Sequence, residues 1–289
     1  MSGNHGTGSN VHASSTGQSL TSVAWLDVHF EACQPEYEAM ARSVGFQSGW
    51  RVLDAGCGSG SFLPLLAELV GPTGSLVALD LAEDNVAAVL DRAAPWQFPC
   101  LLEARVGDVT ALPFPDDHFD AVWFAATSQY LTGDELVTTL AEFRRVVRPG
   151  GIVALKDYDA TVPRFLPAPA NSVTHLCEAV AHSGVTQYMG ILRTPALGMW
   201  LRRAGLNDVW TRTTLVERSA PLGPPERQLW GDGFTYFASL ALGQALLADE
   251  REMWERLANP SERARLLDDP DFYCCEGHVV AVGRVPDGG

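Results

Sequence analysis

The sequence is poor in basic residues and has no long apolar segment. Of its 289 residues, 20 are lysine or arginine and 35 are aspartate or glutamate, so the formal net charge is −15. Such a surface repels the phosphate backbone of nucleic acids, and no basic patch interleaved with aromatic residues is present. No run approaches the roughly 18 consecutive apolar residues that a membrane helix needs. We therefore expect a protein that binds neither nucleic acid nor membrane.

Patterns typical of metal sites and disulfide frameworks are also missing. The six cysteines are scattered, with no Cys-x-x-Cys and no cysteine–histidine ligand spacing. We expect reduced, mostly buried thiols and no metal. Residues 1–19 consist mainly of small and polar residues and lack the apolar core of a signal peptide. They indicate a disordered leader on a cytoplasmic protein.

The most informative segment that is present is Val-Leu-Asp-Ala-Gly-Cys-Gly-Ser-Gly-Ser, residues 52–61. An apolar strand ends at Asp54, a glycine loop follows, and apolar residues then recur at helical spacing. Strand, glycine loop and helix form the first unit of a nucleotide-type binding site. Glycine is needed there because a Cβ would hold the ligand away from the backbone.

Two acidic residues shape the interpretation of this loop. The spacing is G-x-G-x-G rather than the G-x-G-x-x-G of dinucleotide sites, and Asp54 precedes it. A carboxylate there suits a cationic ligand such as S-adenosylmethionine (SAM) better than a pyrophosphate; the alternative is a turn residue or helix cap. A second strand ends at Asp80, which is placed to accept hydrogen bonds from ribose hydroxyls.

Further motifs follow in order: VALD, GDVTALPFPDDHFDAVW and EFRRVVRPGG. Together with VLDAGCGSG, they resemble the class I SAM-dependent methyltransferases, and most closely the small-molecule branch that includes quinone C-methyltransferases and natural-product methyltransferases. The resemblance covers roughly residues 50–158. It implies a cofactor site that surrounds SAM with the following residues: Asp54, Ala55, Gly56, Cys57, Gly58, Gly60, Asp80, Leu81, Asp108, Val109 and Ala125.

The resemblance also implies the fold class, an α/β Rossmann-like, seven-stranded, doubly wound sheet whose last strand is antiparallel. We expect N-terminal helices and a helical insertion between strands 6 and 7. The SAM-binding domain comprises residues 47–219 and 273–289, and residues 20–46 form an N-terminal helical lid. Residues 220–272 contain too much apolar sequence for a hairpin turn, and they are either an acceptor lid or a homodimer contact.

The strand boundaries follow from the apolar runs and from proline. The fifth strand is predicted at residues 151–155, after the turn Arg148-Pro149-Gly150-Gly151. Residues 160–170 contain three prolines and are predicted to form a loop. Two more strands are predicted near 208–216 and 277–285, and Thr132-Gly133-Asp134-Glu135 predicts a capping box.

Methyl transfer from a sulfonium needs alignment and exclusion of water more than acid or metal chemistry. A base is required only if the acceptor carries its proton at neutral pH. Four residues are candidate acceptor contacts or bases: His29, Tyr130, Asp157 and His175. We favour His29 as the base, because it lies in the segment expected to close over the cofactor. Each could instead be a structural or surface residue.

The sequence therefore predicts a SAM-dependent methyltransferase that modifies O, N or C of a small, largely apolar or aromatic molecule in natural-product biosynthesis. One alternative is a quinone C-methyltransferase. Another is a protein of the same fold that binds SAM and acts as a cyclase or binding module. The glycine spacing and the Asp108 motif argue against an NAD-dependent oxidoreductase.

Overall fold

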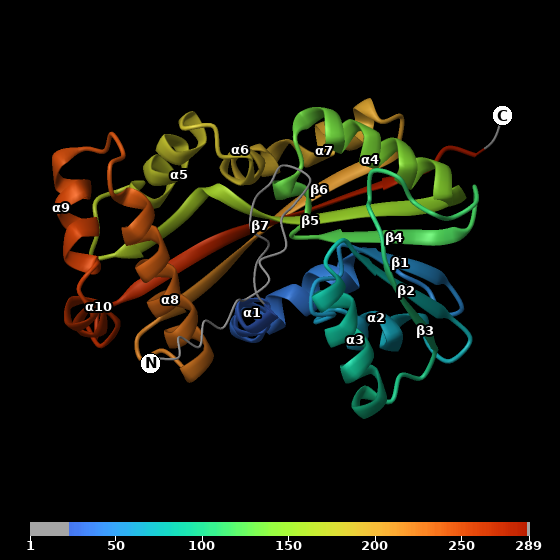
Figure 1. The fold of residues 1–289 in the computed structure, drawn as a ribbon, viewed down its shortest axis with the longest axis horizontal. Helices are drawn as coiled ribbons and strands as arrows, with labels where there is room; N and C mark the ends of the chain where they lie inside the picture. Colours follow the sequence, from blue (N-terminus) through green and yellow to red (C-terminus); the bar gives the residue numbers. More distant parts are fainter. Residues whose placement is uncertain (1–22, 288–289) are drawn as a thin grey trace, which may run out of the picture.

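The computed structural model describes residues 23–287. Seven strands form a single sheet in the order β3-β2-β1-β4-β5-β7-β6 (Figure 1). Strands β1 to β5 are parallel, whereas β7 is antiparallel to both of its neighbours. The strands are β1 (Arg51–Ala55), β2 (Ser75–Asp80), β3 (Leu101–Val106), β4 (Phe119–Ala125), β5 (Val147–Leu166), β6 (Asn207–Ser219) and β7 (Tyr273–Arg284). This topology confirms the predicted fold class.

Helices cover the sheet and gather at one end of it. Near the four shorter strands lie α2 (Leu63–Val70), α3 (Glu83–Trp96) and α4 (Gly133–Val146), whereas α7 (Leu197–Arg203) packs against β6 and β7. At the other end lie α5 (Ser172–His182), α6 (Thr186–Arg193), α8 (Pro224–Ala241), α9 (Ala248–Leu257) and α10 (Pro260–Leu267) (Figure 1). Helix α1 (Val23–Ser43) lies between the two groups. Among the helices of residues 23–287, none is both long enough and apolar enough to cross a bilayer.

Local sequence explains the start of α4. The side chain of Thr132 accepts a hydrogen bond from the backbone N–H of Glu135 at 3.2 Å, and the Glu135 carboxylate accepts from the backbone N–H of Thr132 at 2.8 Å. These two bonds form the predicted capping box and satisfy donors that the first helical turn leaves unpaired.

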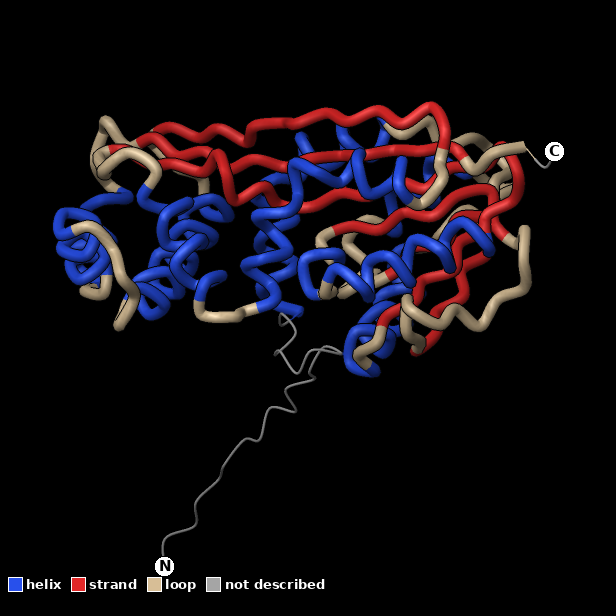
Figure 2. The backbone as a smooth tube through the Cα atoms, turned by 90° about the horizontal axis from the view of Figure 1, so that it is seen from above, coloured by secondary structure: helices blue, strands red, loops and turns tan. Residues whose placement is uncertain are grey.

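Strands β5, β6 and β7 are longer than the sequence predicted. Strand β5 has 20 residues and continues through most of the segment assigned to a loop. The predicted loop at 160–170 is therefore wrong for residues 160–166. Proline does not stop the strand because Pro163 falls where the β5–β7 register shifts, between Asp159 and Arg164, and a ladder hydrogen bond is not needed there. Figure 2 shows these long strands running the length of the molecule.

The long strands support a second helical layer with its own core. Side chains from β5, α5, α8 and α9 pack together there, among them Phe165, Phe234 and Trp254, which are all at most 2% exposed. The insertion 220–272 forms α8, α9 and α10, and α8 packs against α1. The predicted leader, residues 1–19, lies outside the described residues.

Candidate active site

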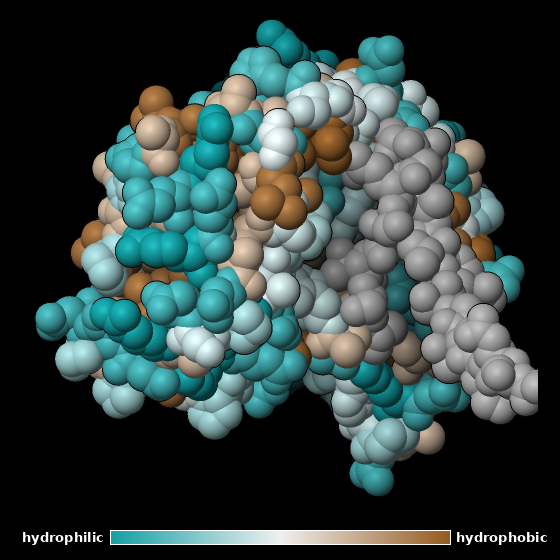
Figure 3. All heavy atoms as spheres, turned by 60° about the vertical axis from the view of Figure 1, so that its left-hand side comes forward, coloured by the Kyte–Doolittle hydropathy of each residue, from teal (hydrophilic) through white to brown (hydrophobic). Residues whose placement is uncertain are grey.

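A cavity of about 760 Å³ lies between the glycine loop and the helical end of the molecule. Its walls come from the loop after β1, the carboxyl ends of β2 and β4, the middle of β5, helices α1, α6 and α8, and β7. The volume is within the range of small-molecule sites. Figure 3 views the molecule from the helical end, where the surface is hollowed between two lobes. A ligand would bind beyond the carboxyl ends of the parallel strands, as in other open α/β sheets.

The glycine loop approaches β4 closely. Gly56 has a φ of +69°, and an added Cβ would collide with the Thr127 side chain. The Thr127 hydroxyl donates to the carbonyls of Gly56 at 3.1 Å and Ala125 at 2.9 Å. Gly56, Cys57, Gly58 and Ala125 all line the cavity. The loop therefore presents bare backbone to a ligand, as its composition predicted.

Asp80 organises the same loop from the end of β2. Its carboxylate accepts from the backbone N–H of Gly58 at 2.8 Å, from the backbone N–H of Ala82 at 2.9 Å and from the side-chain amide of Asn85 at 3.0 Å. It lines the cavity together with Leu81, Asp108 and Val109. Acidic groups beside apolar surface suit ribose hydroxyls and an adenine ring, so this half of the cavity fits SAM.

Asp54 lies directly behind the loop and does not line the cavity. Asp54 is 2% exposed, and its Oδ2 atom has no hydrogen-bond partner among the described residues. Burial raises the pKa of Asp54 to about 8, and the Asp80 carboxylate adds to the shift. A carboxyl group kept neutral in this way would be stabilised in its ionised form by a cationic ligand. The ammonium and sulfonium of SAM would supply that charge.

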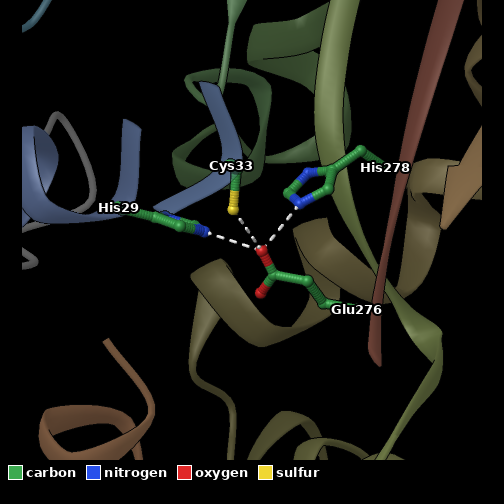
Figure 4. Close-up of side chains that lie close together, drawn as sticks. All are labelled: His29, Cys33, Glu276 and His278. Carbon is green, nitrogen blue, oxygen red and sulfur yellow. Dashed lines mark hydrogen bonds and ion pairs between the residues drawn. The ribbon is translucent and has the colours of Figure 1, made fainter. Parts of the chain in front are cut away.

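The opposite half of the cavity contains a polar cluster where α1 meets β7. Oε1 of Glu276 lies 3.1 Å from His29 Nε2, 3.0 Å from Cys33 Sγ and 3.1 Å from His278 Nε2 (Figure 4). The Tyr37 hydroxyl lies 3.2 Å from the His29 nitrogen and 3.3 Å from the His278 nitrogen. Although burial opposes its charge, His29 and His278 hold the pKa of Glu276 well below its usual range.

Lys156 is a cation that lies close to this cluster and interacts with Cys33 and Glu276. It is 2% exposed, it lines the cavity, and its Nζ lies 3.5 Å from the centre of the Tyr37 ring. No carboxylate forms an ion pair with it among residues 23–287. Burial lowers the pKa of Lys156, against the opposing influence of Cys33, Asp157 and Glu276. A buried ammonium without a carboxylate partner is costly, so it favours an anionic or hydrogen-bond-accepting group in the cavity.

The predicted acceptor residues divide into two pairs. His29 and Tyr130 line the cavity. Asp157 and His175 do not: Asp157 is fully buried and accepts from the Ser128 hydroxyl, and His175 pairs with Glu250 at 2.5 Å. Of the predicted cofactor residues, Ala55 and Gly60 also lie outside the lining. The space beside Gly60 is filled by the side chains of Leu63 and Val89, so close packing requires glycine at this position.

Sequence reasoning missed Cys33, Tyr37, Lys156, Glu276 and His278. Part of the signal was available. Glu276 and His278 are two residues apart in a strand and therefore point to the same face. His29, Cys33 and Tyr37 recur every four residues on one helical face. Nothing in the sequence shows that these two faces meet, because 247 residues separate His29 from Glu276.

Comparison with known proteins identifies the class. Residues 52–151 match the family described as "Methyltransferase domain". The matched region includes the glycine loop, Asp80 and Asp108. With the sheet order and the site geometry, this match shows that the chain carries a class I SAM-dependent methyltransferase domain. It confirms the predicted family, fold class and cofactor.

Among curated proteins, the chain is similar to quinone methyltransferases. It is 36% identical to the 2-phytyl-1,4-naphtoquinone methyltransferase of Synechococcus elongatus, over 38% of this chain and 46% of that one. It is 32% identical to the ubiquinone/menaquinone biosynthesis C-methyltransferase of Pseudomonas entomophila, over 47% and 57%. The chain thus spans about half the length of the curated relatives it matches.

Solved structures share the fold at low identity. A SAM-dependent methyltransferase from Aquifex aeolicus aligns with a TM-score of 0.51 and 24% identity, over 66% of this chain and 89% of that one. The cyclase SpnF aligns with a TM-score of 0.53 and 21% identity, over 89% and 83%.

The raised pKa of Asp54 predicts a pH-dependent stability difference. The carboxyl is ionised above about pH 4 in the unfolded chain but stays protonated to about pH 8 in the fold. Wild type therefore loses stability relative to Asp54→Asn as the pH rises across this window. We expect Asp54→Asn to melt higher than wild type at pH 8 and the difference to shrink at pH 5. Saturating SAM should reduce the difference at pH 8. Equal pH profiles in thermal unfolding would contradict this assignment.

Proposed function

We propose that this protein transfers the methyl group of SAM to an acidic hydroxyl on a small, largely apolar molecule. The observation that carries the proposal is a single cavity that joins a SAM-type loop to a chamber of aromatic side chains containing Lys156. When bound, SAM supplies an electrophilic methyl group.

The protein's own residues would hold the two reactants and exclude water. Asp80 and Asp108 would hold the ribose and adenine, and the backbone of the glycine loop would face the methionine part. Aromatic residues of α1 and α8, among them Trp25, Trp230 and Tyr236, line the acceptor chamber. Alignment inside such a chamber is the main requirement of an in-line displacement.

Lys156 is the group that we assign to the acceptor oxygen. Its ammonium faces the cavity and stabilises the deprotonated form of a hydroxyl, which is the better nucleophile. An acidic hydroxyl would release its proton to solvent before it binds beside Lys156. The acceptor oxygen would then gain the bond to the methyl carbon that the sulfur of bound SAM loses. The similarity to quinone methyltransferases supports an aromatic acceptor, and carbon adjacent to the oxygen is the second possible site of attack.

We propose that α1 and the insertion 220–272 act as a lid over this chamber, with a dimer contact as the alternative. Helices α1 and α8 pack together, and both contribute to the lining. We propose no role in the chamber for Asp157 or His175.

The cofactor part of the proposal predicts selective binding of SAM and S-adenosylhomocysteine over NAD. Asp80→Ala should weaken SAM binding by about 1–3 kcal/mol, because charged acceptors for buried hydroxyls are lost. Asp91→Ala, an exposed change on α3, should leave it unchanged. Isothermal titration calorimetry measures the affinity for each of the three ligands. Tight NAD binding without SAM binding would overturn the cofactor assignment.

The acceptor part predicts label transfer from methyl-labelled SAM to phenols. The protein would be incubated with naphthols, naphthylamines, a naphthohydroquinone and a metabolite extract, and products would be identified by mass. We expect transfer to hydroxyl-bearing acceptors. Lys156→Met should lower kcat/KM by at least about 10²-fold with SAM affinity intact, whereas Arg164→Met, an exposed change on the same strand, should not. SAM binding without transfer to any acceptor would favour the cyclase or binding alternative.

The lid proposal predicts that crowding the contact between α1 and α8 blocks the acceptor. An added Cβ at Gly233 has Trp25 as its nearest neighbour at 4.0 Å, so a larger side chain would extend into the chamber. Gly233→Leu should reduce methyl transfer at least about tenfold and leave SAM binding unchanged. Gly231→Ala, which meets only Leu267 on another side of α8, serves as the control. Unchanged turnover together with a changed association state in light scattering would favour the dimer contact.

A further inference from the structure

The cluster between α1 and β7 has a property that methyl transfer does not require. His29, Cys33, Glu276 and His278 each offer one ligand atom, and these atoms all lie within 4.8 Å of one another (Figure 4). We propose that they bind a divalent transition metal ion of the zinc type, which ties α1 to β7. This goes beyond the proposed function, since neither SAM binding nor transfer to an oxygen needs a metal.

The backbone places two ligands on each element. His29 and Cys33 are four residues apart on α1 and therefore share one helical face. Glu276 and His278 are two residues apart on β7 and therefore share one face of the sheet. In Figure 4 the four side chains approach from the helix on one side and from the strand on the other. Two rigid elements thus present two ligands each to one point.

The spacing of the ligand atoms fits a tetrahedral site. With metal–ligand distances of about 2.0–2.3 Å, neighbouring ligand atoms in a tetrahedron lie about 3.3–3.8 Å apart. Three pairs in the cluster are 3.0–3.1 Å apart, and no pair exceeds 4.8 Å. The observed separations bracket the required ones, so small side-chain movements would complete the site.

Hydrogen bonding alone accounts poorly for the same arrangement. Three donor-type atoms crowd Oε1 of Glu276, although a carboxylate oxygen has only two lone-pair positions. A cation at the centre would give the carboxylate, the thiolate and both imidazoles a common partner.

The donor set selects the kind of ion. One thiolate, two imidazoles and one carboxylate are typical ligands of zinc, cobalt and iron, and they are poor ligands for calcium or magnesium. The thiolate and the carboxylate together balance the charge of a divalent ion, and binding would release the thiol proton of Cys33. Four protein ligands leave no open position, which is the pattern of a structural site.

Such an ion would fix one wall of the cavity. Helix α1 carries Trp25, Phe30 and Tyr37 into the lining. Its attachment to β7 through a metal would hold these side chains over the acceptor. The expected consequence is that α1 is protected from proteolysis and from hydrogen exchange when the metal is bound.

Cobalt(II) tests this proposal because it reports thiolate ligation directly. The full-length protein would be stripped with a chelator, titrated with Co²⁺ alone and followed by absorption spectroscopy. We expect one equivalent to produce a near-ultraviolet thiolate-to-cobalt charge-transfer band and visible bands of tetrahedral cobalt, and Zn²⁺ to displace both. Cys33→Ser should abolish the near-ultraviolet band, and His278→Ala should weaken binding at least about tenfold. Cys100→Ser, which removes a thiol elsewhere, should keep both bands.

Calorimetric titration of the same samples with S-adenosylhomocysteine distinguishes a failure of the metal site from a failure of the proposed function. It also shows that each variant is folded, and Glu276→Gln is a second variant should Cys33→Ser fail to fold. If the protein binds S-adenosylhomocysteine but forms no stoichiometric cobalt complex, the metal site is overturned and the proposed function is left intact. A charge-transfer band that survives in Cys33→Ser would overturn it as well. A cobalt complex without cofactor binding would instead count against the proposed function.

Discussion

Strand β7 is hydrogen-bonded to β5 on one side and to β6 on the other along nearly its whole length. This pairing holds the two halves of the molecule together. It extends the sheet beyond β1 to β4, and the extension supports the second helical layer, of which α6 and α8 contribute to the lining of the cavity. It also sets the register that places His278 beside Tyr158 and the polar face of β7 under α1. Without it, the cofactor half would have no opposite wall.

Buried charge is distributed unevenly across the cavity. The cofactor side carries Asp54 and Asp80, and the acceptor side carries Lys156 beside Glu276. Because all of these groups are buried, bulk water cannot stabilise their charges fully, and each depends on a neighbouring group or on a ligand. Asp80 is satisfied by backbone and amide donors, whereas Asp54 and Lys156 are not. Asp54 lies behind the glycine loop, whereas Lys156 lines the cavity beside Tyr37. This arrangement suits a cationic cofactor near the loop and an anionic acceptor near Lys156.

The cofactor half was predictable from sequence because its signals are local. The glycine loop, Asp80 and Asp108 each follow a strand within a short stretch, and carboxyl ends of parallel strands meet at one edge. The acceptor half was not, because it depends on contacts between distant segments. The alternation of Glu276 and His278 identifies a face, but only the antiparallel register brings that face to Cys33 and Tyr37. The length of β5 was missed because the position of Pro163 at a register shift is a property of the pairing and not of the sequence around it.

Helix α1 and strand β7 meet at the polar cluster but lie far apart along the chain. This separation affects the order in which the parts of the protein fold. The contacts of His29 and Cys33 with Glu276 close a loop of more than 240 residues, and such contacts form late because the entropy of closing long loops must be lost first. The glycine loop and strands β1 to β4 need only residues 51–125. During synthesis on the ribosome, the cofactor half can therefore assemble well before β7 emerges. The apolar face of α1 can pack against α2 at that stage, whereas the face that carries His29 and Cys33 must wait for β7.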